Sequence, residues 1–265
     1  MAKTRSKWSE SVYRKRLKEG RGQGELAAYK PWITIHDLAS KGYATRILGH
    51  KTRRIHHLLS HNELYYFCLL DWSDHVLDIR EQFPMRLAET LEIAAEAGIR
   101  HPWDRRSGFP YVMTTDFLVT TDCGIVARTV KAAEELKNRR VREKFEEIER
   151  RYWENCGIQW KIVTENQINA DKAKNILWLR SGVPAEEAVP DGCLLEECCR
   201  LFIELYGQEG VPFPAIVDAV EGYADAPPGA GLSIFKKLAA SGRLSVDLSV
   251  PINFAEPRAE EWNTK

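Results

Sequence analysis

The sequence predicts an α/β protein (α+β) in which a mixed sheet is flanked by helices and is followed by a small helical domain. Three observations lead to this prediction. Two apolar runs are joined by turn residues, a long charged segment carries apolar residues at helical spacing, and short helical segments follow after about residue 166. Strands and helices that succeed one another in this way are typical of a sheet with helices packed on its faces.

Two neighbouring apolar runs, residues 115–119 and 126–131, predict a β-hairpin. The residues between them, 120–124, are Thr-Thr-Asp-Cys-Gly and have the chemistry of a turn. A third run at residues 159–164 predicts a further strand of the same sheet.

The register of this hairpin places Asp116 beside Arg128 and Thr129. Because side chains alternate along a strand, Thr129 and Lys131 share one face. An acid on one strand beside a lysine on the next is how metal-dependent nucleases hold divalent cations against a scissile phosphate. We therefore expect one site to hold Asp116, Thr129 and Lys131.

A second acid lies upstream, at the predicted start of a helix. Ser60, followed three residues later by Glu63 and then by an apolar run, is a helix N-cap signal. Glu63 is therefore either a capping-box carboxylate or a metal ligand, and the local sequence leaves both alternatives open.

A third acid, Glu149, lies in the charged run from Glu134 to Glu154. Apolar residues recur there at helical spacing and predict one long amphipathic helix packed on the sheet; they are Val141, Phe145, Ile148 and Tyr152. At about 100° per residue, Glu149 borders the buried stripe of this helix. It lies either near the site or at an ordinary stripe edge.

The chemistry expected of these residues is phosphodiester hydrolysis. A phosphodiester gains negative charge as water attacks, which suits hard cations on oxygen ligands. Glu63 and Asp116 would bind one or two ions, with the carbonyl of Val130 as a further ligand, and Lys131 would act as a point charge. Otherwise Lys131 is a solvated strand lysine and Asp116 a turn or edge residue.

The chain is expected to have three parts. Residues 1–50 form a basic, glycine-punctuated arm, residues 51–165 the catalytic domain, and residues 166–265 the C-terminal domain. Within the catalytic domain, residues 85–112 are expected to be a loop excursion between strands. Residues 3–21 hold eight lysines and arginines against two glutamates, so the arm is either a phosphate contact or a disordered solubilising tail.

The C-terminal part carries the elements of a winged helix. Helices are expected at residues 214–220 and 231–241, followed by a strand at 244–250. In this winged-helix-like domain Lys236 and Lys237 would face DNA. The alternative is a small domain that docks partner proteins.

Composition excludes several classes of protein. The net charge is zero, with 44% hydrophobic and 29% charged residues, which is typical of a globular protein. The six cysteines form no Cys-x-x-Cys pair, so neither a zinc site nor a disulfide framework is expected. Reduced thiols, together with the absence of a signal peptide and of a long apolar run, predict a cytoplasmic protein without a membrane segment.

Several motifs, taken in order, resemble the TnsA family, the endonuclease subunits of heteromeric bacterial transposases. They span roughly residues 15 to 165 and comprise residues 19–24, 56–60, Glu63, residues 78–84, residues 115–119, Val130, Lys131 and residues 149–153. The C-terminal third resembles the family only in general character.

The resemblance implies a restriction-endonuclease-like domain that uses Mg²⁺, with Mn²⁺ as a substitute, to cut the non-transferred strand at transposon ends. It implies a partner transposase of the TnsB type and an AAA+ regulator of the TnsC type. The catalytic residues would be Glu63, Asp116, Lys131 and Glu149, and the metal ligands Glu63, Asp116, Thr129 and Val130. Expected DNA contacts are Arg21, Arg53, Arg54, His56, His57, Lys236 and Lys237, although the histidines could instead simply pack.

Two positions depart from the family pattern. Thr129 stands where the family has an amide, so position 129 contacts metal through its hydroxyl or only through water. Ala132 stands where a proline is expected, which affects only the strand exit. Two alternatives to a transposon-end endonuclease therefore stay open: a non-catalytic winged-helix adaptor, and a stand-alone repair or restriction nuclease.

Overall fold

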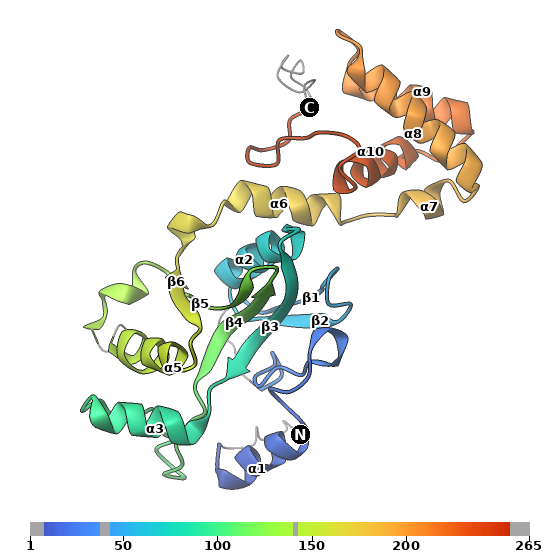
Figure 1. Ribbon diagram of the computed structural model, residues 1–265. Helices are drawn as coiled ribbons and strands as arrows, with labels where there is room; N and C mark the ends of the chain where they lie inside the picture. The colour runs from blue at the N-terminus through green and yellow to red at the C-terminus, as the bar shows by residue number, and fades with distance from the viewer. Residues whose placement is uncertain (1–7, 38–42, 140–142, 255–265) are drawn as a thin grey trace. The chain divides into compact units, whose positions relative to one another are not determined.

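The structure is a computed structural model that describes residues 8–37, 43–139 and 143–254. It divides into two compact units, one ending at Asn169 and the other beginning at Ala170 (Figure 1). Each unit is described by itself.

The first unit is built on a mixed sheet, as the sequence predicts. Its strands follow the order β3-β4-β5-β6, antiparallel except for the parallel pair β5 and β6. They are β3 (Val76–Pro84), β4 (Thr114–Thr121), β5 (Gly124–Val130) and β6 (Gln159–Val163). A separate antiparallel pair, β1 (Thr45–Leu48) and β2 (Ile55–Leu58), precedes them. The hairpin expected at residues 115–131 is confirmed by β4 and β5.

Helices cover both faces of this sheet (Figure 1). Phe117 of β4 meets the ring of Tyr66 in α2 (His61–Trp72). The next residue, Leu118, lies in a core cluster with residues of α3 (Leu87–Glu96) and α5 (Arg150–Asn155). Because successive strand residues point to opposite faces, α2 lies on one face and α3 with α5 on the other.

Two helical segments of this unit differ from the sequence prediction. Residues 85–112 are not only a loop, because α3 occupies residues 87–96 and ends before Gly98, whose φ is +65°. The expected helix from Glu134 to Glu154 is not one α-helix. It contains a 3₁₀ turn η2 (Glu135–Lys137), a π-helical segment η3 (Lys144–Glu149) and then α5; Val141 lies outside the described residues.

The described part of the basic arm is folded against β3. It contains α1 (Glu10–Lys18) and a 3₁₀ turn η1 (Leu26–Ala28). Gly22 packs so closely on Pro84 that an added Cβ would lie 2.2 Å from the proline Cγ. Residues 8–37 are therefore not a disordered tail. Three of the expected basic contacts, Lys3, Arg5 and Lys7, lie outside the described residues.

The second unit is helical in the residues that the structure describes. Its helices, which follow a short turn η4 (Glu165–Gln167), are α6 (Ala170–Leu179), α7 (Ala185–Ala188), α8 (Gly192–Gly207), α9 (Phe213–Ala224) and α10 (Ala230–Ala240). Phe235 of α10 and Phe202 of α8 are fully buried at its centre, with ring centroids 5.9 Å apart. The helices expected at residues 214–220 and 231–241 are confirmed by α9 and α10.

The strand expected at residues 244–250 is wrong. This segment runs along the helices without regular structure, with Leu244 and Leu248 buried. The side-chain amide of Asn175 donates to the carbonyls of Leu248 and Val250, at 2.9 and 2.7 Å, where a strand partner would otherwise donate. No strand, and therefore no wing, is present among the described residues of this unit, so the expected winged helix is not seen there.

None of the helices in the described ranges combines the length and the apolar character needed to traverse a bilayer.

Candidate active site

Glu63 lies in the first turn of α2, where Ser60 caps the helix. The hydroxyl of Ser60 accepts a hydrogen bond from the Glu63 N–H at 3.1 Å and donates to Glu63 Oε1 at 3.0 Å. The backbone N–H of Leu59 donates to Glu63 Oε2 at 2.9 Å. The N-cap predicted from the sequence is confirmed, and it holds the carboxylate in one orientation.

Asp116 is buried in β4 and accepts three hydrogen bonds. The N–H of Val130 and the ammonium of Lys131 donate to Oδ2, at 2.8 and 3.1 Å. The side-chain amide of Gln82 donates to Oδ1 at 3.2 Å. Oδ1, which accepts only one of these bonds, keeps a lone pair for a further partner.

The three groups Glu63, Asp116 and Lys131 act on one another electrostatically. Burial, and secondarily the negative charge of Asp116, raise the pKa of Glu63 to about 7. Burial alone would lower the pKa of Lys131, but the attraction and hydrogen bond of Asp116, with a contribution from Glu63, raise it instead. The lysine is therefore cationic at neutral pH, between two acids drawn from different elements.

Thr129 and Glu149 form a second buried group behind this one. Thr129 donates to Glu149 Oε1 and accepts from the indole N–H of Trp160, at 2.5 and 3.0 Å. Thr115 donates to the same oxygen of Glu149 at 2.6 Å. The expected sharing of one face by Thr129 and Lys131 stays a prediction, because β5 ends at Val130; the charge of Glu149, which binds Thr129, does act on Lys131.

Glu149 is fully buried rather than at the edge of a stripe. It ends the π-helical segment η3, whose wider turns change the angle between successive side chains from the 100° assumed for an α-helix. Burial raises the pKa of Glu149 to about 7, against the opposing hydrogen bonds of Thr115 and Thr129. Its Oε2 atom has no hydrogen-bond partner among the described residues.

The donor set at Glu63 and Asp116 fits a divalent cation that is also bound by substrate. Within the described ranges, no group of three or more His, Cys, Asp or Glu side chains is placed to hold a metal by itself. Mg²⁺ is commonly bound by one or two carboxylates together with water and substrate phosphates. A cation between the acids would also relieve the repulsion that raises the pKa of Glu63.

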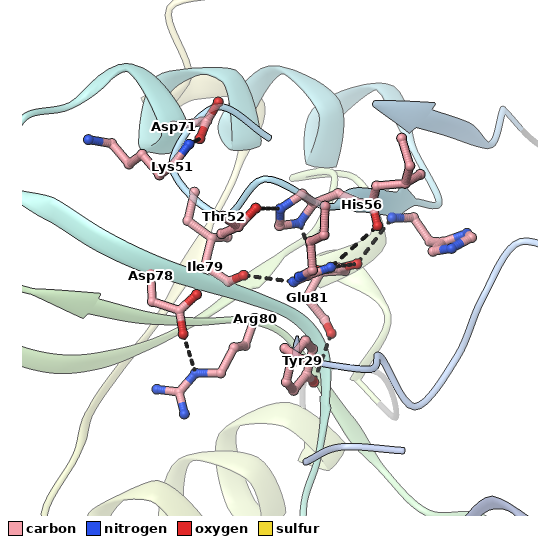
Figure 2. Close-up of polar contacts among 12 residues, drawn as sticks. Tyr29, Lys51, Thr52, His56, Asp71, Asp78, Ile79, Arg80 and Glu81 are labelled. Carbon is pink, nitrogen blue, oxygen red and sulfur yellow. Dashed lines mark hydrogen bonds and ion pairs between the residues drawn. The ribbon is translucent and has the colours of Figure 1, made fainter. Parts of the chain in front are cut away.

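A buried cluster beside the site accounts for two of the expected DNA contacts. Figure 2 shows Glu81 and His56 side by side, and the carboxylate of Glu81 also binds Arg54. Arg54 Nη1 donates to Glu81 Oε1 at 2.8 Å, and His56 Nδ1 lies 2.8 Å from Oε2. The pKa of Glu81, which burial alone would raise, is lowered to about 2 by the hydrogen bonds and charges of His56 and Arg54. His56 has no exposed surface and Arg54 very little, so the expected DNA contacts of both are replaced by this ion pair.

The other expected DNA contacts of the first unit differ in exposure. Arg21 is committed to Asp37 and Glu19, at 2.6 and 2.9 Å. His57 is half-buried, and burial lowers its pKa. Arg53 is exposed, in the turn between β1 and β2, and stays available to DNA.

In the second unit both expected contacts have internal partners. Lys236 Nζ donates to the carbonyl of Ser181 at 3.0 Å and lies 4.4 Å from the ring centre of Trp178. Lys237 forms an ion pair with Glu186.

Sequence reasoning missed Gln82, which touches Asp116 directly. It lies in the segment 78–84 that carries the family resemblance, but no local pattern in that segment indicates its role. The only available signal is a polar side chain in the middle of a run that forms a buried strand.

Comparisons with known proteins show which family the chain is similar to. A family model described as TnsA-like endonuclease N terminal matches residues 73–165, and one described as TnsA endonuclease C terminal matches residues 167–248. The chain is 47% identical over 190 residues to Transposon Tn7 transposition protein TnsA of Escherichia coli, covering 71% of this chain and 68% of that protein. The chain therefore belongs to the TnsA family of transposition endonucleases.

Proposed function

We propose that this protein cleaves the non-transferred strand, leaving its cut at the 5′ ends of a transposon, in a divalent-metal-dependent reaction. The observation that carries the proposal is the convergence of Glu63, Asp116 and Lys131, with Lys131 3.1 Å from Asp116. Two carboxylates that can bind metal, with a cation that can stabilise developing negative charge, suit such hydrolysis.

Each residue has a distinct role in this proposal. Glu63 and Asp116, with the carbonyl of Val130, would hold one or two Mg²⁺ ions, and Mn²⁺ could substitute. A bound ion would supply positive charge for the phosphate and lower the pKa of a water ligand. Lys131, protonated, stabilises negative charge that develops on the attacked phosphate.

Thr129 and Glu149 support the site without ligating metal in this proposal. The hydroxyl of Thr129 is committed to Glu149 and Trp160. Through its backbone, Thr129 precedes Val130, whose N–H binds Asp116. Glu149 therefore holds the end of β5 in place. This also positions the N–H of Val130, which donates to Asp116.

The surface that meets transposon-end DNA is proposed to include the loop after α3. Arg100, Arg105 and Arg106 have no carboxylate partner among the described residues. Trp103 is 44% exposed beneath Arg100, whose guanidinium lies 4.3 Å from its ring centre. An open cleft of about 450 Å³ adjoins them. Unpaired guanidiniums and an exposed aromatic ring suit a phosphate backbone.

The proposed reaction takes place within an assembly. The family implies a partner transposase of the TnsB type, which cuts and joins the other strand, and an AAA+ regulator of the TnsC type. The name of the Escherichia coli relative, a transposition protein, supports a role on transposon ends.

The test is strand mapping in a complex reconstituted with the partner transposase and its end DNA. With Mg²⁺, we expect cuts on both strands. With Glu63→Gln, the non-transferred strand should stay intact while the partner still cuts and joins the other strand. Cleavage of the non-transferred strand by Glu63→Gln at the wild-type rate would overturn the proposal.

A further inference from the structure

The backbone of β3 has an unusual conformation at Gln82. Its φ is +48°, and among the described residues no other non-glycine residue inside a strand has a positive φ. This left-handed conformation costs about 1–2 kcal/mol for a residue with a Cβ. Such strain persists only where the surrounding structure imposes it, and it concentrates at functional sites.

The conformation of Gln82 breaks the alternation of side chains along β3. Glu81 and Phe83 are two residues apart and would share one face of a regular strand. Instead Glu81 binds His56, whose ring packs on Phe67 of α2. Phe83 packs against Trp153 of α5, on the other face.

The alternation of side chains along the neighbouring strand β4 also breaks, at the position opposite Gln82. Thr115 pairs with Phe83 and Phe117 pairs with Glu81, which leaves Asp116 across from Gln82. Thr115 accepts from the indole of Trp153 on the α5 face, whereas Phe117 meets Tyr66 on the α2 face. A regular β4 would place Asp116 with Leu118 on the α5 face; the break turns its carboxylate toward Glu63 of α2.

The side chain of Gln82 also binds the carboxylate of Asp116. Its amide nitrogen donates to Asp116 Oδ1 at 3.2 Å, and its amide oxygen accepts from the Thr114 hydroxyl at 3.0 Å. Gln82 is buried, so water competes only weakly for these two hydrogen bonds.

Both sides of Gln82 are anchored. Its carbonyl accepts from the N–H of Trp32 at 3.2 Å. The preceding residue, Glu81, is fixed by the buried ion pair with Arg54, and its carbonyl accepts from the hydroxyl of Tyr29 at 3.1 Å (Figure 2). This surrounding network supplies the rigidity that a strained residue needs.

We propose that Gln82 is a positioning residue for the hydrolysis: it orients the carboxylate of Asp116 toward the divalent cation shared with Glu63. This inference rests on the proposed metal-dependent function. Gln82 touches no reacting atom; it acts through Asp116, as outer partners of metal ligands generally do.

The test replaces Gln82 in the full chain and has two measurements. Gln82→Met keeps the length of the side chain and removes the amide. Gln82→Gly keeps the left-handed backbone, which glycine adopts without strain, so it carries the test if Gln82→Met does not fold. The matched control is Gln159→Met, because Gln159 is a glutamine of the same sheet whose side chain binds Arg128 instead.

The first measurement is the affinity for Mn²⁺ alone, from the electron paramagnetic resonance signal of the free ion. We expect affinity to fall about 10- to 100-fold in both Gln82 variants and to stay unchanged in Gln159→Met. The second measurement needs no metal. Hydrogen exchange at the Val130 N–H, which donates to Asp116, should become faster in both variants, relative to the Ala127 N–H of the same strand.

The outcomes separate this inference from the proposed function. Wild-type Mn²⁺ affinity and wild-type Val130 exchange in both variants would overturn the role of Gln82. If the wild-type protein binds no Mn²⁺, the proposed metal site fails. The exchange measurement then decides by itself whether Gln82 holds Asp116.

Discussion

The ammonium of Lys131 lies 3.1 Å from Oδ2 of Asp116, although Lys131 follows the end of β5 and Asp116 lies within β4. The N–H of Val130 donates to the same oxygen. The end of one strand is thus tied to the catalytic acid of the next. Contacts within the protein already hold these side chains in place. A cation that binds there therefore loses less free energy to ordering them.

Removing the ammonium of Lys131 should slow cleavage strongly while leaving the fold intact. We expect Lys131→Met to lower the rate of non-transferred-strand cleavage about 10²- to 10³-fold, because negative charge developing on the phosphate loses its nearest cation. Single-turnover cleavage in the reconstituted complex measures this rate. Lys161→Met, which changes an exposed lysine on β6, is the control and should cleave at the wild-type rate.

Replacing the adjacent residues Arg54 and Arg53 should have very different effects on the free energy of unfolding. Arg54→Ala leaves the buried Glu81 without its guanidinium partner and should lower the free energy of unfolding by about 3–5 kcal/mol. Arg53→Ala changes an exposed residue and should alter it by less than about 0.5 kcal/mol. Urea unfolding of both variants compares them directly, and equal stabilities would contradict the structural role assigned to Arg54.

Glu149 should make the metal-free protein less stable as pH rises. Its pKa is about 7 in the folded protein and near 4.5 when unfolded, so between these values the folded state binds more protons. Stability therefore falls as pH increases through this window, by about 1–3 kcal/mol for this group. Glu63, whose pKa is raised in the same direction, adds to the slope.

Glu149→Gln removes one of these two groups. Denaturant unfolding in the presence of a chelator, at several pH values from 5 to 8, should give a shallower decline for Glu149→Gln than for the wild-type protein. An unchanged slope would mean that Glu149 titrates normally despite its burial.

The loop after α3 should contribute to DNA affinity without affecting chemistry. Replacing both Arg105 and Arg106 with Ala should weaken binding to duplex DNA of any sequence. It should also reduce the slope of log affinity against log salt concentration by about 1 per lost phosphate contact. Fluorescence anisotropy across a salt series measures both. A variant with Arg14→Ala and Lys15→Ala, on exposed α1, tests whether the loop or overall charge is responsible.

Local sequence predicted the parts of the site that depend on short-range patterns. The turn at residues 120–124 fixed the hairpin that carries Asp116, and Ser60 with Glu63 marked the start of α2 correctly. Lys131 was expected near Asp116 and is hydrogen-bonded to it. The hairpin and the helix start follow from turn chemistry and capping, which act over a few residues.

Other features depended on contacts that local patterns do not encode. The left-handed backbone conformation of Gln82 and the broken side-chain alternation along β4 arise from the pairing of two strands. The π-helical turn that buries Glu149 departs from the 100° spacing on which a helical-wheel argument relies. Arg54 and His56 resembled surface cations until Glu81, distant in sequence, supplied a buried partner.

The prediction of a C-terminal strand was wrong for a similar reason. Residues 244–250 alternate as a strand does, but alternation records only which residues are apolar. The amide of Asn175 satisfies the carbonyls of Leu248 and Val250, so no neighbouring strand is required.

The most direct test compares two aspartates of the same hairpin. Asp116→Asn removes the charge at the site, whereas Asp122→Asn changes an exposed residue of the turn, whose carboxylate binds His75. Mapping cut ends in the reconstituted complex should show that Asp122→Asn still cleaves the non-transferred strand and Asp116→Asn does not. Cleavage of that strand by Asp116→Asn at the wild-type rate would contradict the account.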